Sequence, residues 1–184
     1  MRAAPRSPVA HYAKGEVLRA QGRPEEAITE YETVLALNRN WVGAIAQLGW
    51  CKFYAGFIDQ SIPLVERAIR LSPRDRVIGI WYYRIGRVNL LQSRTDEAIL
   101  WLEKARSANP EHPLHRAYLA SAYALKGETE RAAAELAEAQ RLSDGRYSSI
   151  ARLRSTGYFG VPTIRALFEA TLFAGLRKAG MPEE

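Results

Sequence analysis

The chain has 184 residues, 47% of them hydrophobic and 25% charged, a balance typical of one folded domain or one short repeat array. Its net charge of +6 permits an anionic partner, but the basic residues alternate with glutamates, which argues against a dedicated nucleic-acid binder. A single cysteine, Cys51, excludes an internal disulfide, and no apolar run approaches the roughly 20 residues that a membrane span needs. We therefore expect a cytoplasmic protein without nucleic-acid or membrane partners.

Four segments of similar length each have the pattern of two helices joined by a tight turn. They span residues 8–41, 42–75, 79–112 and 113–146, after an N-terminal arm at residues 1–7 that we expect to be disordered. A small residue in the second helix of each repeat sets the period. These residues are Ala27, Ser61, Ala98 and Ala132, separated by 34, 37 and 34 positions. We expect the extra residues before the third repeat to form a longer loop or an added turn within residues 74–79.

Each predicted first helix also carries a small residue at one position, where it lets the second helix approach closely. These residues are Gly15, Gly49, Gly86 and Ala120. Apolar residues around them recur at three and four positions, as amphipathic helices require, and no segment alternates with a period of two. Pro24 suits a first helical position. The sequence therefore predicts an all-α protein.

The spacing of these residues resembles the tetratricopeptide repeat family across residues 8–146, because a period of 34 and the small, aromatic and proline positions match its pattern. Clear instances are Leu48-Gly49 with Pro73, and Ile85-Gly86 with Pro110. The resemblance implies a right-handed superhelical solenoid of four helix-turn-helix repeats. It also implies a function in protein–protein interaction, with a peptide or helix bound on the concave face formed by the first helices.

The period stops after the fourth repeat, and residues 147–184 form a separate tail. Ile150 and Leu153 indicate a helix that breaks at Gly157 and Gly160, and a second helix starts near Pro162. An open stack of helices exposes an apolar end, so the simplest role for this tail is a helical cap. The alternative is that the tail lies in the groove of its own or a neighbouring chain, as a bound partner would.

The end of the tail carries a second, narrower resemblance over about fifteen residues. Ala170-Thr171-Leu172, then residues 174–180 (AGLRKAG) and Pro182-Glu183, look like the C-termini of tetratricopeptide regions in bacterial class III adenylate/guanylate cyclase-like proteins. The chain contains no cyclase catalytic domain. The resemblance therefore implies a regulatory or sensory role in bacterial signalling.

Few residue patterns point to catalysis or metal binding, although one sequence does not exclude a Ser-His-Asp or Cys-His arrangement. The chain has no Walker loop, G-x-G-x-x-G, H-E-x-x-H or C-x-x-C motif. His112 and His115 are three residues apart, but a metal site would need further ligands, so we expect them to lie at a solvated helix start. Cys51 falls among apolar residues, where an inert buried thiol is usual. We predict that the protein is not an enzyme and holds no metal or cofactor.

The family resemblance assigns the concave face to four positions of each first helix. In chain order they are Val9, Tyr12, Glu16 and Arg19; Gly43, Ala46, Trp50 and Phe53; Ile80, Tyr83, Arg87 and Leu90; and Leu114, Ala117, Ser121 and Ala124. Aromatic residues flanked by arginines are typical of binding hot spots. The candidate partner-binding residues are Tyr12, Glu16, Arg19, Trp50, Phe53, Tyr83, Arg84, Arg87 and Leu90.

We expect Trp50, Phe53 and Tyr83 to hold the partner and Arg19, Arg84 and Arg87 to steer it. One alternative is that the three aromatic side chains pack only against the tail or a neighbouring helix. The Lys and Asn residues with which some family members grip chaperone tails are missing here, and only Arg84 fits that role. Two further alternatives for the whole chain are a self-associating scaffold, dimeric through the tail or these aromatic residues, and a ligand-sensing regulatory module.

Overall fold

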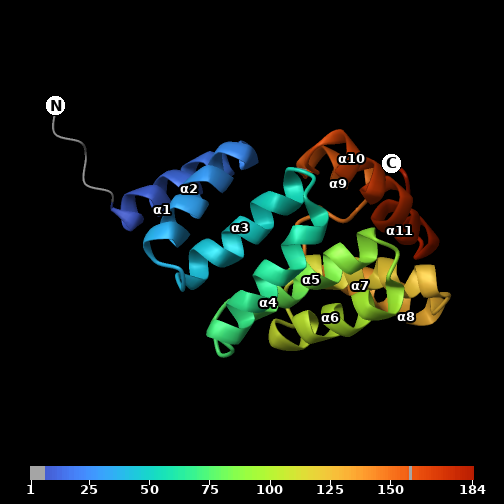
Figure 1. Ribbon diagram of the computed structural model, residues 1–184. Coiled ribbons are helices and arrows are strands. Elements are labelled where there is room, and N and C mark those ends of the chain that lie inside the picture. The colour runs from blue at the N-terminus through green and yellow to red at the C-terminus, as the bar shows by residue number, and fades with distance from the viewer. Residues whose placement is uncertain (1–6, 158) are drawn as a thin grey trace. The chain divides into compact units, whose positions relative to one another are not determined.

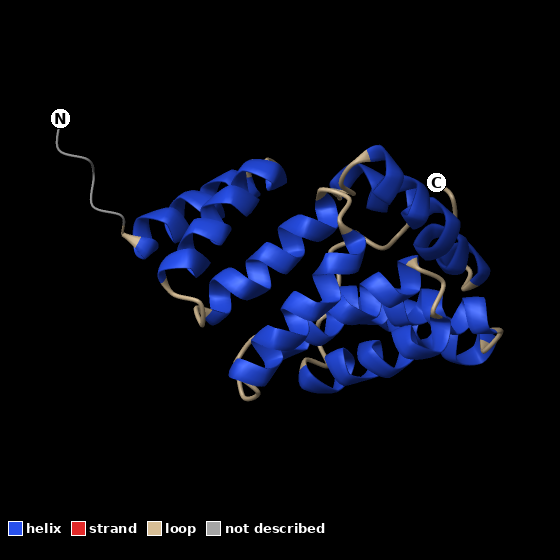
Figure 2. Ribbon diagram, viewed as in Figure 1, coloured by secondary structure: helices blue, strands red, loops and turns tan. Residues whose placement is uncertain are grey.

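The computed structural model describes residues 7–157 and 159–184, and within these ranges every regular element is helical (Figure 2). The predicted all-α class is therefore confirmed. The helices divide into two compact units, Met1–Asp75 and Arg76–Glu184, called the N-terminal and the C-terminal unit below. The predicted disorder of the arm at residues 1–7 concerns positions that, apart from Ser7, lie outside the described residues.

The N-terminal unit contains the first two helix pairs (Figure 1). Helix α1 (Pro8–Ala20) packs against α2 (Pro24–Leu37), and α3 (Val42–Tyr54) packs against α4 (Ser61–Leu71) after a short 3₁₀ turn, η1 (Ile58–Gln60). Helix α2 also packs against α3. One core cluster of this unit contains Leu18, Ala27, Ile28, Tyr31, Val34, Ala44, Leu48 and Cys51. The expectation of a buried thiol at Cys51 is therefore met.

The first two helix pairs of the C-terminal unit repeat this arrangement. Helix α5 (Ile78–Leu91) packs against α6 (Thr95–Ala108), and α7 (Pro113–Lys126) packs against α8 (Thr129–Arg141). Helix α7 also packs against α6, as α3 does against α2. The extra residues of the third repeat fall in the connection from Leu71 to Ile78, which contains no helix.

The small residues of the first helices produce the close pairing that their positions predict. A Cβ atom at Gly15 would lie 2.8 Å from Cε1 of Tyr31, and one at Gly86 would lie 2.7 Å from Cγ of Leu102. Real Cβ atoms do not approach other atoms so closely, so only glycine allows the second helix to sit at this distance. Pro24 occupies the start of α2, as predicted, where its missing N–H costs nothing.

The tail forms three short helical segments separated from α8 by a turn region. They are α9 (Ile150–Thr156), α10 (Pro162–Phe168) and α11 (Ala174–Lys178), with a π-helical turn, η2 (Glu169–Phe173), joining the last two. The predicted break between Gly157 and Gly160 is confirmed, because α9 ends at Thr156 and α10 begins at Pro162. The π-helical turn interrupts what the sequence predicts as one continuous helix.

The structure shows where the tail packs within its own chain. Helix α11 and η2 pack against α7, and η2 also packs against α5, so the tail covers the first helices of the third and fourth repeats. Figure 1 shows these segments in orange and red beside α7. The tail therefore covers a face of its own chain, and that face is the one to which the family resemblance assigns partner binding.

Candidate binding site

The first helices carry the predicted binding positions, and we call the surface at these positions the first-helix face of each unit. In the N-terminal unit this face lies on α1 and α3, and in the C-terminal unit it lies on α5 and α7. Five of the nine candidate residues are in the N-terminal unit and four are in the C-terminal unit. The two faces differ in what covers them.

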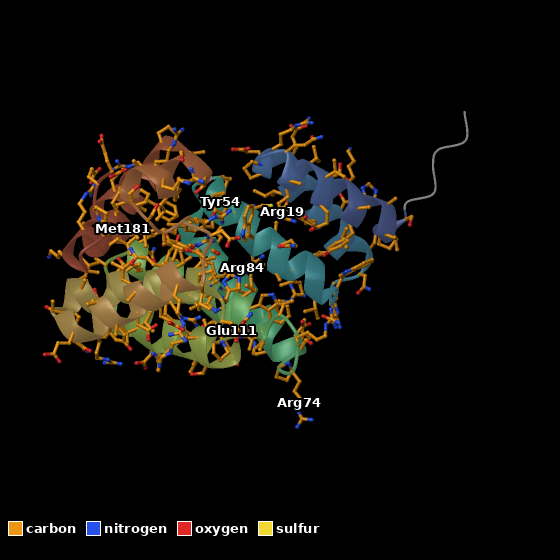
Figure 3. The ribbon with its side chains drawn as sticks, turned by 180° about the vertical axis from the view of Figure 1, so that it is seen from behind. Arg19, Tyr54, Arg74, Arg84, Glu111 and Met181 are labelled. Atoms are coloured by element: carbon orange, nitrogen blue, oxygen red, sulfur yellow. The ribbon has the colours of Figure 1, made fainter. Side chains whose placement is uncertain are left out.

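Arg19 and Trp50 form the centre of the N-terminal first-helix face. The guanidinium carbon of Arg19 lies 5.3 Å from the centroid of the Trp50 ring, within the range of a cation–π interaction. Trp50 also contacts the Tyr54 ring, with the centroids 4.2 Å apart. Figure 3 labels Arg19 and Tyr54, both of which contact Trp50. Trp50 is itself half-buried, so part of its ring remains exposed at the surface.

Glu16 holds Arg19 in place and ties the face to the core. Its carboxylate accepts a hydrogen bond from Nη2 of Arg19 at 2.9 Å and one from the Tyr31 hydroxyl at 2.5 Å. Burial, followed by this hydrogen bond, raises the pKa of Tyr31, so its hydroxyl remains protonated and donates. A third donor, Nε2 of Gln47, lies 3.5 Å from the Glu16 carboxylate. Glu16 thus positions Arg19, and its carboxylate already accepts hydrogen bonds from groups within the protein.

Arg19 keeps hydrogen-bonding capacity at this surface. Its side chain is 26% exposed, although its Nε is buried and has no hydrogen-bond partner among the described residues. A buried N–H without an acceptor costs about 1–3 kcal/mol, so such groups are uncommon in folded proteins. The planar guanidinium group is also suited to carboxylate and carbonyl oxygens. Arg19 therefore gives this face a partly exposed cation suited to an external acceptor, although its Nε lies below the surface.

Tyr12 extends the aromatic surface toward the start of α3. Its ring stacks on that of Trp41, with centroids 5.3 Å apart and an interplanar angle of 19°. Gly43 lies beneath this pair, because a Cβ there would sit 3.0 Å from the Tyr12 hydroxyl oxygen. Trp41 precedes the first residue of α3, so positions counted along the helix do not include it, and the sequence did not predict its place on this face.

Phe53 was predicted together with Trp50 as an aromatic residue not needed by the helix stack. The structure separates the two residues, because Phe53 is completely buried and meets the Tyr54 ring edge-on at 4.8 Å. Trp50 is one helical turn away from it and stays half-buried. Only Trp50 of this pair offers surface that a partner could touch.

The four candidate residues of the C-terminal unit are buried. Tyr83, Arg84, Arg87 and Leu90 are between 0% and 8% exposed. Tyr83 stacks on His115 with centroids 5.5 Å apart and meets Tyr118 edge-on at 5.0 Å, and the Arg87 guanidinium lies 5.4 Å from the Tyr83 ring. These contacts are packing contacts within α5 and α7, the arrangement that the sequence left open as the alternative to partner binding for Tyr83.

Ser121, on α7, marks where the tail meets the C-terminal first-helix face. Its hydroxyl donates to the backbone carbonyl of Leu172 at 3.1 Å and lies 3.4 Å from that of Thr171. Gly175 lies directly against it, because a Cβ at Gly175 would be 2.2 Å from Oγ and 2.5 Å from the backbone oxygen of Ser121. A side chain of any size at position 175 is therefore incompatible with this packing.

His115 corrects one prediction made from the sequence. The residue is completely buried, and its Nδ1 lies 3.1 Å from the carbonyl oxygen of Ala105, so it is not part of a solvated helix start. His112 stacks on it with centroids 4.4 Å apart. Burial, with a smaller contribution from His112, lowers the pKa of His115 to about 4, and the imidazole is therefore neutral at pH 7.

The described residues contain no group of three or more His, Cys, Asp or Glu side chains placed to hold a metal ion. None of the helices in the same ranges is long and apolar enough to cross a membrane. Each unit consists of paired helices with small residues between them. The N-terminal unit also has a partly exposed aromatic face.

Family models agree with this geometry. Models described as tetratricopeptide repeat match residues 8–41, 47–113 and 102–147, which together make up well over half of the chain. The chain belongs to the tetratricopeptide repeat family. Members of this family are in general interaction modules, so protein binding is the broad function that membership supports. No curated protein matches this chain in sequence.

Solved structures of other tetratricopeptide repeat proteins share the fold. Residues 41-end of MamA from Desulfovibrio magneticus RS-1 are 18% identical, with a TM-score of 0.68 over 96% of this chain and 98% of that one. YrrB, described as a TPR protein with an unusual peptide-binding site, is 17% identical, with a TM-score of 0.64 over 95% and 85%. PilF of Pseudomonas aeruginosa is 16% identical, with a TM-score of 0.71 over 95% and 72%. At these identities the likeness shows the fold alone.

Proposed function

We propose that this chain is an interaction module that binds an extended peptide or a helix of a partner protein on its N-terminal first-helix face. The observation that carries the proposal is the Arg19–Trp50 cation–π pair, both side chains of which are partly exposed at the surface. Arg and Trp are among the residue types that most often dominate binding energies at protein interfaces. The YrrB neighbour, whose description names a peptide-binding site, is consistent with this class of partner.

The chemistry of the face indicates what the partner segment presents. The rings of Trp50, Tyr12 and Trp41 favour an apolar or aromatic side chain, and Arg19 favours a carbonyl or carboxylate oxygen beside it. Glu16 already neutralises part of the Arg19 charge, so a single acceptor fits better than a run of acidic residues. We therefore keep Tyr12, Glu16, Arg19 and Trp50 of the predicted set in this proposal. Phe53, Tyr83, Arg84, Arg87 and Leu90 take packing roles instead, because they are buried.

The narrower context of the proposal comes from the sequence of the tail. Its resemblance to regions of cyclase-like proteins supports a regulatory or scaffolding role in bacterial signalling, in the cytoplasm. A self-associating scaffold is the competing use of the same face, in which a second copy of the chain would be the partner. Sedimentation of the purified chain separates these uses, because a dimer that Trp50→Ala dissolves would indicate self-association.

A peptide-display selection on the purified full chain tests the proposal, because it finds binding sequences for a partner of any identity. Peptides selected by the wild-type chain are measured against Trp50→Ala by calorimetry, and we expect binding to weaken about 30-fold or more, the effect of losing a hot-spot residue of about 2 kcal/mol. Arg19→Ala should weaken the same peptides, while Arg23→Ala should not, because Arg23 lies in the turn before α2 and pairs with Glu26.

Trp101→Ala is the matched control for Trp50→Ala. Trp101 is also half-buried and also lies near a cation, Lys104 at 4.3 Å, but it belongs to α6, a second helix. The proposal fails if the selected peptides bind Trp50→Ala as tightly as the wild type, or if Trp101→Ala weakens them equally.

A further inference from the structure

We propose that the C-terminal first-helix face is a second interaction site, and that the tail, residues 147–184, is a helical ligand that occupies it and can be removed. This goes beyond the proposed function, because it concerns α5 and α7 and uses neither Arg19 nor Trp50. Four features of the tail and of its attachment support the inference.

The first feature is where the tail packs. In a continuing repeat array, each new first helix packs against the second helix before it, as α3 does against α2 and α7 does against α6. The tail does not follow this pattern. Its segments η2 and α11 lie on α7, and η2 reaches α5, so the tail covers two first helices in the way that a bound helix would.

The second feature is a contact that selects for a particular kind of helix. The Ser121 hydroxyl reaches the carbonyls of Thr171 and Leu172, which belong to the π-helical turn, while Gly175 one turn later admits no side chain. Leu172 and Leu176, on the flanks of this contact, are completely or almost completely buried. The face therefore fits an apolar helix that has a small residue at one fixed position.

The third feature is that bonds within the tail hold its parts together. The backbone N–H groups of Ile150 and Ala151 donate to the carbonyls of Pro182 and Glu183, each at 2.9 Å. Arg154 pairs with Glu169 and with Glu183, at 2.7 and 2.9 Å, so the start and the end of the tail are joined. These bonds involve no residue of α5 or α7, and we therefore expect the tail to keep its arrangement when it leaves them.

The fourth feature is the connection between α8 and α9. It contains the exposed residues Asp144, Gly145 and Arg146 ahead of the buried Tyr147, and Gly145 has a φ of +73°. A short connection of this kind keeps the tail at an effective concentration near the millimolar range. A helix supplied from outside would therefore compete poorly until the contact of the tail is weakened.

The test weakens that contact in the full chain and supplies the tail from outside. Gly175→Leu places a side chain where Ser121 leaves no room, and Ala166→Leu makes a similar change at an exposed site of α10 as the control. A labelled peptide of residues 147–184 should bind Gly175→Leu at least about 100-fold more tightly than it binds the wild type or Ala166→Leu. The same peptide carrying Gly175→Leu should bind none of the three chains.

The proposal is overturned if the wild-type peptide binds all three chains equally. It is also overturned if the peptide binds none of them although circular dichroism shows that Gly175→Leu is still helical. If Gly175→Leu does not fold, a protease site inserted between Gly145 and Arg146 replaces it. After cleavage, the labelled peptide should exchange with the bound tail while the rest of the chain stays folded. Exchange that occurs only as the whole unit unfolds would show that the tail is an inseparable part of the core.

Discussion

The two first-helix faces of this chain occupy equivalent places in their repeats, yet one keeps exposed aromatic surface and the other is covered by the tail. On α1 and α3 the face carries the large side chains of Arg19, Trp50 and Tyr12, which stay half-buried. On α7 the equivalent positions hold Ala117, Ser121 and other small residues, and a helix lies directly on them. On α7 the small side chains allow the backbone of the tail to approach closely, as the contact between Ser121 and Gly175 shows.

This comparison also predicts that side chains on the two faces contribute differently to stability. Tail residues such as Leu176 are buried in the C-terminal unit and contribute to its folding, whereas Trp50 keeps surface available for a partner. Substitutions on the two faces should therefore differ in what they change, and the largest difference is expected in the free energy of unfolding.

Truncation of a tail residue should cost far more stability than truncation at the exposed face. Leu176→Ala should lower the free energy of unfolding by about 2–5 kcal/mol, because the side chain is fully buried and leaves a cavity. Trp50→Ala should lower it by only about 1–2 kcal/mol, since part of the ring is already exposed. Urea unfolding followed by circular dichroism measures both, and equal costs would remove the distinction between the faces.

Acid should destabilise the packing around the covered face through His115. The pKa of this residue falls to about 4 in the folded chain, below the ordinary value of 6.5, because burial disfavours the charged imidazole. Its contribution to stability is therefore complete above pH 6.5 and is lost as the pH falls toward 4. The loss amounts to at most about 3 kcal/mol, at 1.36 kcal/mol for each pH unit between the two values.

His115→Phe isolates this effect, because it removes the titrating group and keeps a ring beside Tyr83. The free energy of unfolding of this variant should fall less between pH 7 and pH 4.5 than that of the wild type. His112→Phe is the control, since His112 is less buried and stacks on the same residue. If His115→Phe and the wild type lose the same stability over this range, the buried imidazole is not the cause.

His115 also illustrates what the sequence could and could not predict. The period of 34 residues and the glycines at one helical position predicted the four helix pairs, because both features follow directly from how helices pack. Burial at a repeat start depends on the neighbouring repeat, and the sequence around His115 does not show that Ala105 supplies an acceptor. The same limit applies to Phe53 and Leu90, whose helical positions predicted a binding face although both are buried.

The tail shows a second limit. Its glycines and prolines predicted where α9 ends and α10 begins, since these residues interrupt helices locally. The π-helical turn and the contact of Gly175 with Ser121 depend on residues about 50 positions apart, and no local pattern identifies them. Small residues near the end of the tail were visible in the sequence, but their partner was not. For this reason the sequence left open whether the tail caps the array or occupies a groove.

The smallest effect concerns the ion pairs that join the two ends of the tail, and it tests whether the tail keeps its own structure. Hydrogen bonds from Arg177, and to a smaller extent from Arg154, lower the pKa of Glu183 to about 2. Arg177→Gln should raise this pKa toward the ordinary value of about 4.3, as an NMR titration of the carboxylate would show. Exposed pairs of this kind contribute little to stability, so the unfolding midpoint at pH 7 should not change measurably.

The same titration in Gly175→Leu extends the comparison of the two faces. If bonds within the tail hold it together, Glu183 should keep its low pKa even when the tail no longer lies on α7, because Arg154 and Arg177 both belong to the tail. A return of the pKa of Glu183 to its ordinary value in that variant would contradict this. The arrangement of the tail would then depend on the face that it covers, and a free tail would have to refold each time it bound.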